Sequence, residues 1–190
     1  MNRISSRSDY EIFRYADQKS LGIKRKWIAI ASNEIYLFEV RLRKLEFALN
    51  CSSNHVKIFF RKILFRRISV KLGYSISPNT FGPGLSIAHR GTIVVNGGAR
   101  IGANCRVHAD VNIGTEAGKS DSAPNIGDNC YIGPGAKIFG DIVIGSYSVI
   151  GANAVVNKSF PEGNQTIAGV PAIVVSKKNS ERLLINGFEF

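Results

Sequence analysis

The sequence contains little of what builds secreted or membrane-spanning proteins. Its three cysteines, Cys51, Cys105 and Cys130, include no CxxC pair, so we expect buried reduced thiols rather than a disulfide framework or a zinc knuckle. No run of about 18 uninterrupted apolar residues is present, which excludes an ordinary membrane-spanning helix. The N-terminal stretch MNRISSRSDYEIFRYADQKS lacks the apolar region of a signal peptide, and the sequence therefore predicts a cytoplasmic protein.

Proline is absent and glycine nearly absent from residues 8–73, where apolar side chains recur every three or four positions. This pattern predicts two or three helices. One is expected from about Asn33 to Asn50. Another is expected from Asn54 to Leu72, with Ser53 or Asn54 as its N-cap and Gly73 following its end.

Positive charge is concentrated in the same part of the chain. Residues 1–73 carry 16 basic and 6 acidic side chains, whereas residues 74–190 carry 9 and 8. The segment 54–72 contains six basic residues among apolar ones, which fits either a packed helix with a solvated basic face or a helix on an anionic membrane surface. Nucleic acid is not expected as a partner, because no recognised reading motif accompanies the charge.

From residue 95 onward, aliphatic residues recur at every sixth position, often followed by glycine. Neither a helix nor an alternating strand has this period, but the hexapeptide repeat of a parallel β-helix does. Each repeat supplies a short strand with its aliphatic side chain inward and a tight turn, and three repeats form one coil. The ten expected core positions are Val95, Ile101, Val107, Ile113, Ile126, Ile132, Ile138, Ile144, Ile150 and Val156.

The repeat is interrupted once and then ends. Ile113 and Ile126 are 13 positions apart instead of 12, so a loop is expected to leave the coil between them. After Val156 the pattern decays into a predicted turn and a closing strand. We therefore expect a basic helical segment over 1–73, a β-helix over 74–176, and over 177–190 a tail that is either a short helix or loosely held.

Four stretches, GPGLSIAHRGTIVVN, IGANCRVHADVNIGT, IGDNCYIGPGAKIFGDIVIG and TIAGVPA, resemble the serine O-acetyltransferase branch of the hexapeptide-repeat acyltransferases. The matching region spans residues 82–175, about half of the chain. The resemblance implies a left-handed parallel β-helix, acetyl-CoA as co-substrate in a cleft between neighbouring coils, and a homotrimer. It leaves two assemblies as alternatives, a single trimer and a dimer of trimers.

The resemblance also assigns a catalytic residue, His89, as the general base that takes the proton from an acceptor hydroxyl. Histidine suits this role because its pKa of about 6.5 leaves a neutral imidazole available. The alternative is a core histidine, since extending the sixfold register back from Val95 puts position 89 in an inward slot. His108 either approaches His89 as a second site residue or faces solvent. With only two histidines in the repeat region, no metal site is expected.

The resemblance further implies a set of residues that contact acetyl-CoA. Glycines and small residues would line the cleft and allow close approach of the pantetheine arm, and lysines would pair with a CoA phosphate; the alternative roles are turn glycines and solvated lysines. The set comprises Gly114, Thr115, Gly133, Pro134, Gly135, Ala152, Ala168, Gly169, Lys158, Lys177 and Lys178.

The chain departs from the serine enzymes at four positions. Ser75 and Ala88 replace two acidic residues near the histidine, and Ser122 and Ala123 replace the arginine–histidine pair that would bind a carboxylate. These departures favour a sugar or glycan hydroxyl as the acceptor, in capsule or exopolysaccharide synthesis at the inner face of the plasma membrane. The alternatives are serine O-acetyltransfer in cysteine biosynthesis, and a non-catalytic trimer that binds a partner protein.

Overall fold

The computed structural model describes residues 3–119 and 122–189. Its N-terminal part is helical, with α1 (Arg7–Ser20), α2 (Lys26–Ser32), α3 (Glu34–Cys51) and α4 (His55–Leu72). The helices predicted over 33–50 and 54–72 are confirmed as α3 and α4. Asn33 and Asn54 cap these two helices, because each side-chain oxygen accepts a hydrogen bond from a first-turn backbone N–H. None of the helices in the described ranges has the length and apolar content to cross a membrane.

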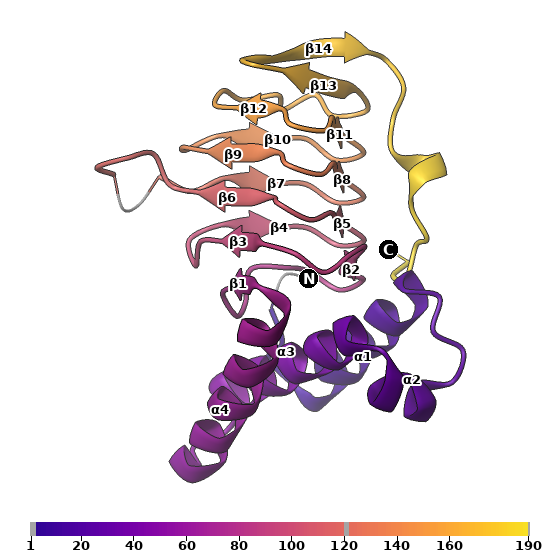
Figure 1. The fold of residues 1–190 in the computed structure, drawn as a ribbon, viewed down its shortest axis with the longest axis vertical. Helices are drawn as coiled ribbons and strands as arrows, with labels where there is room; N and C mark the ends of the chain where they lie inside the picture. Colours follow the sequence, from indigo (N-terminus) through magenta and orange to yellow (C-terminus); the bar gives the residue numbers. More distant parts are fainter. Residues whose placement is uncertain (1–2, 120–121, 190) are drawn as a thin grey trace.

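After Gly73 the described chain winds into a parallel β-helix with three sheets (Figure 1). Sheet A contains β1 (Tyr74–Ile76), β3 (Ile93–Val95), β6 (Asn112–Gly114), β9 (Lys137–Phe139) and β12 (Val155–Val156). Sheet B contains β4 (Arg100–Ile101), β7 (Asn125–Ile126) and β10 (Val143–Ile144). Sheet C contains β2 (Ser86–Ile87), β5 (Arg106–Val107), β8 (Tyr131–Ile132), β11 (Val149–Ile150), β13 (Thr166–Gly169) and β14 (Ala172–Ser176).

The expected core positions point inward as predicted. All ten are buried, and the aliphatic residues stack in columns, since Val107 pairs with Ile132 and Ile132 with Ile150 in register. Cys105 and Cys130 are buried free thiols in the same core, whereas Cys51 is exposed, contrary to the expectation for that residue. The loop expected between Ile113 and Ile126 leaves the coil after β6 and projects from one side of the molecule (Figure 1).

The C-terminal part contains the expected closing strand, as one arm of a hairpin, and a short helical turn, but its tail is not loosely held. β13 and β14 form an antiparallel hairpin that caps the last coil. The chain then descends along the outside of the coils, through a short 3-10 turn at Glu181–Leu183, to reach α1 (Figure 1). It is held there by Asn104, whose side chain bonds the backbone of Gly187 and Phe188, and by an ion pair between Lys19 and Glu189. We call residues 177–189 the C-terminal strap.

One hydrophobic core joins α3 and α4 to the β-helix. Phe38 and Leu42 of α3 and Ile68 and Leu72 of α4 belong to the same buried cluster as the inward column of the coils. Tyr74, the first residue of β1, packs edge-on against Phe38 with ring centroids 4.9 Å apart. The helical segment therefore seals the open end of the first coil.

Candidate active site

His89 lies in the turn that follows β2, where the chain passes from sheet C to sheet A, and we call the stack of such turns the C–A corner. Its side chain is exposed, so the inward slot considered for position 89 is wrong. The inward position belongs to Ile87, which pairs in register with Val107. These two residues are 20 positions apart, two more than three repeats of six, and the longer first coil places His89 outside the core.

His108 occupies the same corner one coil above. Its ring centroid is 5.8 Å from that of His89 and 4.9 Å from that of Tyr131. Burial, followed by the nearby charges of Arg106 and His89, lowers the pKa of His108. Its Nε2 atom is buried without a hydrogen-bond partner among the described residues. The corner therefore presents an exposed imidazole next to a second imidazole that favours the neutral form.

A tyrosine fixes the backbone of His89. The hydroxyl of Tyr74 donates a hydrogen bond of 2.9 Å to the carbonyl oxygen of His89. The Tyr74 ring is buried, and its burial raises the pKa of the hydroxyl, which keeps the donor protonated. This contact holds the main chain of the turn from within the core.

Two buried acidic residues on the helices fix the segment that leads into His89. Asp17 of α1 accepts hydrogen bonds of 2.9 Å from the backbone N–H groups of Gly84 and Leu85. Glu39 of α3 accepts one of 3.3 Å from the N–H of Ile87. Burial raises the pKa of Glu39 well above its usual range, and the Asp17 charge adds to this effect, so the neutral acid is favoured.

Arg43 of α3 balances the buried negative charge. Its guanidinium lies 2.8 Å from a carboxylate oxygen of Asp17 and 2.9 Å from one of Glu46, and all three side chains are at most 2% exposed. It also donates to the carbonyl oxygens of Phe81 and Gly82 at 3.0 and 2.7 Å. Burial opposes the Arg43 charge, but the two carboxylates outweigh it and raise the Arg43 pKa.

Sequence reasoning missed these positioning residues, although a signal was present. Glu39 and Glu46 are seven positions apart and fall on the helix face that carries Phe38, Leu42 and Leu45. Acidic residues on an apolar helix face are seldom buried without partners, so their position predicts a buried polar contact. The identity of that contact, the backbone beneath His89, required the fold.

Most of the predicted acetyl-CoA contacts lie above the histidines on the C–A corner. Successive turns are bonded one to the next: the N–H of Gly135 donates to Ala109 O at 3.0 Å, and that of Asn153 to Pro134 O at 2.8 Å. The column consists of small residues: Gly133 and Gly135 pack tightly against the next turn, whereas Pro134, Ala152 and Gly169 are exposed on its outer side. Its predicted members are Gly133, Pro134, Gly135, Ala152, Ala168 and Gly169, and we call this column the ledge.

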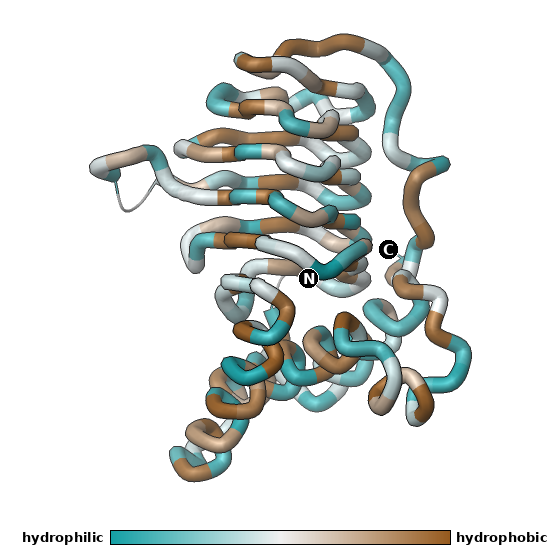
Figure 2. The backbone as a smooth tube through the Cα atoms, in the orientation of Figure 1, coloured by the Kyte–Doolittle hydropathy of each residue, from teal (hydrophilic) through white to brown (hydrophobic). Residues whose placement is uncertain are grey.

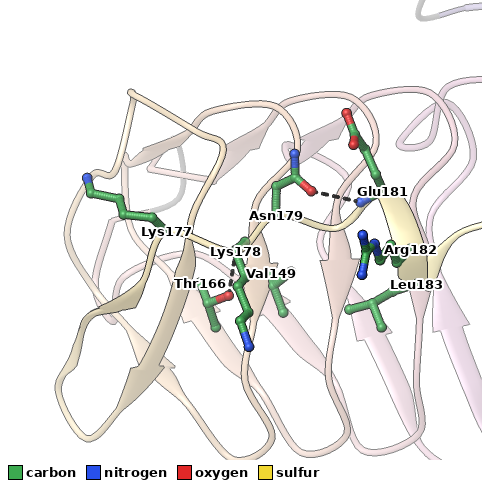
Figure 3. Close-up of a pocket in the computed structure, with 8 residues that line it drawn as sticks. All are labelled: Val149, Thr166, Lys177, Lys178, Asn179, Glu181, Arg182 and Leu183. Carbon is green, nitrogen blue, oxygen red and sulfur yellow. Dashed lines mark hydrogen bonds between the residues drawn. The ribbon is translucent and has the colours of Figure 1, made fainter.

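The other predicted contacts lie elsewhere on the chain. Gly114 and Thr115 lie at the root of the projecting loop, at the corner between sheets A and B, and Lys158 lies in a turn at that corner. Lys177 and Lys178 follow β14, which runs away from the ledge, so they lie at the other end of the sheet C strands. There they line a cavity of about 730 Å³ together with Thr166 and strap residues that include Arg182 (Figure 3). This cavity does not include the histidines.

The chain resembles known proteins in sequence and in fold. The family described as "Bacterial transferase hexapeptide (six repeats)" matches residues 123–158. A serine acetyltransferase of Staphylococcus xylosus is 30% identical over 164 residues, covering 85% of this chain and 67% of that protein. One of Haemophilus influenzae is 36% identical over 121 residues, covering 63% of this chain and 45% of that protein. A structure titled "Soybean Serine Acetyltransferase Complexed with Serine" superposes with a TM-score of 0.70 at 26% identity, covering 90% of this chain and 70% of that chain.

These similarities define the class of protein. The chain belongs to the hexapeptide-repeat acyltransferase family, and its relatives are named serine acetyltransferases. The expectation of an acetyl-CoA-dependent acyltransferase is confirmed at the level of the family. The hexapeptide match and the structural neighbours also imply the left-handed form of the β-helix.

The expected sugar acceptor is wrong, and so is the capsule or exopolysaccharide subgroup. Relatives and structural neighbours are named for serine, which supports the alternative acceptor. The expectation relied on Ser122 and Ala123, which supply no cation for a carboxylate. Missing side chains do not specify an acceptor, because a cation from another element can take the place of the missing pair. Arg100 of β4 lies beside this part of the loop, and its backbone N–H donates to the carbonyl of Pro124.

Proposed function

We propose that this chain transfers the acetyl group of acetyl-CoA to the hydroxyl of serine. The observation that carries the proposal is the adjacent pair His89 and His108 at the foot of the ledge, in a chain whose relatives are named serine acetyltransferases. His89 is the general base. It takes the proton from the serine hydroxyl as that oxygen attacks the thioester carbonyl carbon; the carbon–sulfur bond then breaks, and the imidazolium returns the proton to the CoA thiolate.

The ledge suits an extended thiol ester. Four strand spacings separate β2, next to His89, from β13, which ends in Ala168 and Gly169. At about 4.8 Å per spacing this distance is roughly 19 Å, measured along a column of small side chains. The pantetheine arm would lie along this column with its thioester toward the histidines. His108, as a neutral imidazole, would contact the reacting groups without adding positive charge next to His89.

A complete site would require a second copy of the chain. The histidines and the ledge lie on the C–A corner, whereas the loop, Arg100 and Lys158 lie at the corner between sheets A and B. Packing copies around a threefold axis would bring the two kinds of corner together, so the expected homotrimer remains part of the proposal. Lys158, one of the lysines suggested for the CoA phosphate, would then come from a neighbouring copy, whereas Lys177 and Lys178 lie at a different corner.

Arg100 is the proposed partner of the serine carboxylate. It is exposed at the start of β4, next to Ser122 and Ala123, which occupy the positions of the arginine–histidine pair of the serine enzymes. Its Nη1 donates to the carbonyls of residues 97–99, which fixes the guanidinium at this corner. An arginine held in this way has further N–H groups that can donate to a carboxylate, and two parallel hydrogen bonds of this kind form the bidentate geometry that carboxylates favour.

The proposal is tested with the purified full-length chain, acetyl-CoA and L-serine, with release of the CoA thiol as the signal and mass spectrometry of the product. We expect serine-dependent CoA release and an O-acetylated product. His89→Gln should lower kcat by at least a hundredfold while acetyl-CoA still protects against thermal unfolding. Protection by acetyl-CoA without serine-dependent release would refute serine as the acceptor. Near-normal activity of His89→Gln would refute its role as the base.

A further inference from the structure

Helix α4 has two apolar faces on opposite sides. One face packs inward, with Ile68 and Leu72 buried in the core and Phe65 packed against it. The opposite face carries Val56, Phe59, Phe60 and Val70, which are 65%, 60%, 58% and 73% exposed, with the half-buried Ile63 between them. These five residues follow the spacing of a single helical stripe. An ordinary surface helix has only one apolar face, so the outer stripe of α4 indicates a contact outside the chain.

Basic side chains surround this outer stripe. The helix carries six lysines and arginines and no acidic residue. Arg66 and Arg67 are exposed, and neither forms an ion pair with any residue in the described ranges. Along α4, hydrophobic and hydrophilic segments alternate as far as its free end, away from the β-helix (Figure 2). The outer surface of the helix is therefore both apolar and strongly cationic.

A second element of the same kind lies at this end of the molecule. The exposed fractions of Trp27 and Ile28 on α2 are 77% and 57%, and three basic residues, 24–26, precede them. In Figure 1, α2 and the free end of α4 both lie at the end of the molecule farthest from β14. Exposed tryptophan next to lysine and arginine is the combination found at the boundary between lipid and water.

We propose that the outer face of α4, assisted by α2, binds the surface of an anionic phospholipid bilayer. The helix would lie in the interfacial plane with Phe59 and Phe60 between the headgroups. Its lysine and arginine stems would extend along the apolar layer so that their charges reach the lipid phosphates. The rest of the chain would stay in water, because α3 covers the inner face of α4.

The charge of the chain favours a bilayer over the alternative occupants. A second copy would bring the same cationic helix, or a β-helical part of near-neutral charge, against this face. Neither offers negative charge for the exposed basic residues of α4 that form no ion pair among the described residues, Arg66 and Arg67 among them. A nucleic acid would supply phosphates but would leave the apolar stripe in water, whereas an anionic lipid surface accommodates both the stripe and the charges.

The test is flotation of the full-length protein with vesicles, without acetyl-CoA or acceptor, so that its result is independent of the proposed function. One set contains phosphatidylcholine alone and the other replaces one lipid in four with phosphatidylglycerol. Two double variants probe the face: Phe59→Ser with Phe60→Ser, and Arg66→Gln with Arg67→Gln. A matched control, Lys119→Gln with Lys137→Gln, removes the same charge from the β-helix.

The proposal requires binding to the anionic vesicles that weakens with salt. Each α4 variant should reduce the partition coefficient, by roughly 30-fold for the arginine pair, while the control changes it little. All substituted residues are exposed, so circular dichroism should match that of the unaltered chain. Equal recovery with both lipid sets would overturn the proposal. So would a phenylalanine variant that binds vesicles normally but changes the oligomeric state, or a protein that leaves the vesicles when short duplex DNA is added.

Discussion

The Arg43 cluster gives the sharpest prediction about how the helices support the site. Arg43→Met keeps an apolar stem but removes the charge, together with the contact between the guanidinium carbon and the Phe13 ring, whose centroid lies 4.8 Å away. Asp17 and Glu46 would then be buried without their cation, and the carbonyls of Phe81 and Gly82 would lose their donor. Removal of one member of a buried ionic cluster costs about 3–5 kcal/mol. That is a large fraction of the roughly 5–15 kcal/mol that stabilises an ordinary domain.

The assay is equilibrium unfolding in urea, followed by circular dichroism and by tryptophan fluorescence. We expect Arg43→Met to lower the unfolding free energy by about 3–5 kcal/mol with little change in the slope against urea. Adding Asp17→Asn and Glu46→Gln to it should recover part of the loss, because no uncompensated charge remains. A loss below about 1 kcal/mol for Arg43→Met would refute the reasoning, since it would mean that the cluster is not desolvated in solution.

Three further predictions concern the acidic, tyrosyl and cationic groups around the site. Tyr74→Phe should lower the unfolding free energy by about 1–2 kcal/mol, because the His89 carbonyl loses its donor. The same loss should lower kcat and change the KM for acetyl-CoA less. The folded-state pKa of Glu39 is raised above its ordinary value of 4.5, so its contribution to stability declines as pH rises from there through the folded-state pKa. Glu39→Gln should remove this decline, as measured by urea unfolding across the pH range. Arg100→Ala should raise the KM for serine roughly tenfold or more and leave that for acetyl-CoA unchanged, as measured by CoA release.

Each of these predictions has a matched control and an outcome that contradicts it. Tyr10→Phe changes a buried tyrosine on α1, so an equal loss of kcat in both tyrosine variants would argue against a specific role for Tyr74. For Glu39→Gln, a constant difference from the unaltered chain at every pH would mean that this carboxyl has an ordinary folded-state pKa. Lys119→Ala serves as the control for Arg100, because it removes a charge from the loop itself; an equal effect on serine KM would indicate a general electrostatic effect.

The parts of the fold that follow from short repeating patterns could be predicted from the sequence. The sixfold spacing identified ten inward aliphatic residues from Val95 to Val156, because each coil repeats the same local geometry, but it did not identify the buried Val111 and Ile142. The start of α4 was marked by a candidate cap, Ser53 or Asn54, of which the structure uses Asn54, and the start of α3 was placed near Asn33 from the apolar spacing. The first coil was misjudged at His89, since two extra residues between Ile87 and Val95 shift the sixfold register.

The remaining features depend on contacts between distant segments. Nothing local to Glu39 or Tyr74 indicates that their partners are Ile87 and His89, because those contacts exist only after α3 packs under the first coil. The acceptor was misjudged for a related reason. Ser122 and Ala123 indicate which groups are missing, whereas the cation proposed to replace them, Arg100, is more than 20 positions away and comes beside them only through the pairing of β4 with β7.

The C-terminal strap changes how this solenoid is expected to come apart. A stack of coils ordinarily frays from its ends, since each layer contacts only its neighbours. Here the segment leaving the topmost hairpin returns to the base, where Gly187 fits against the backbone of Ala16 with no room for a side chain. The hydroxyl of Ser180 also bonds to the carbonyl of Asn129 midway along this path. Peeling off the last coil therefore also loosens α1, and amide exchange should report one concerted opening instead of a gradient from cap to base.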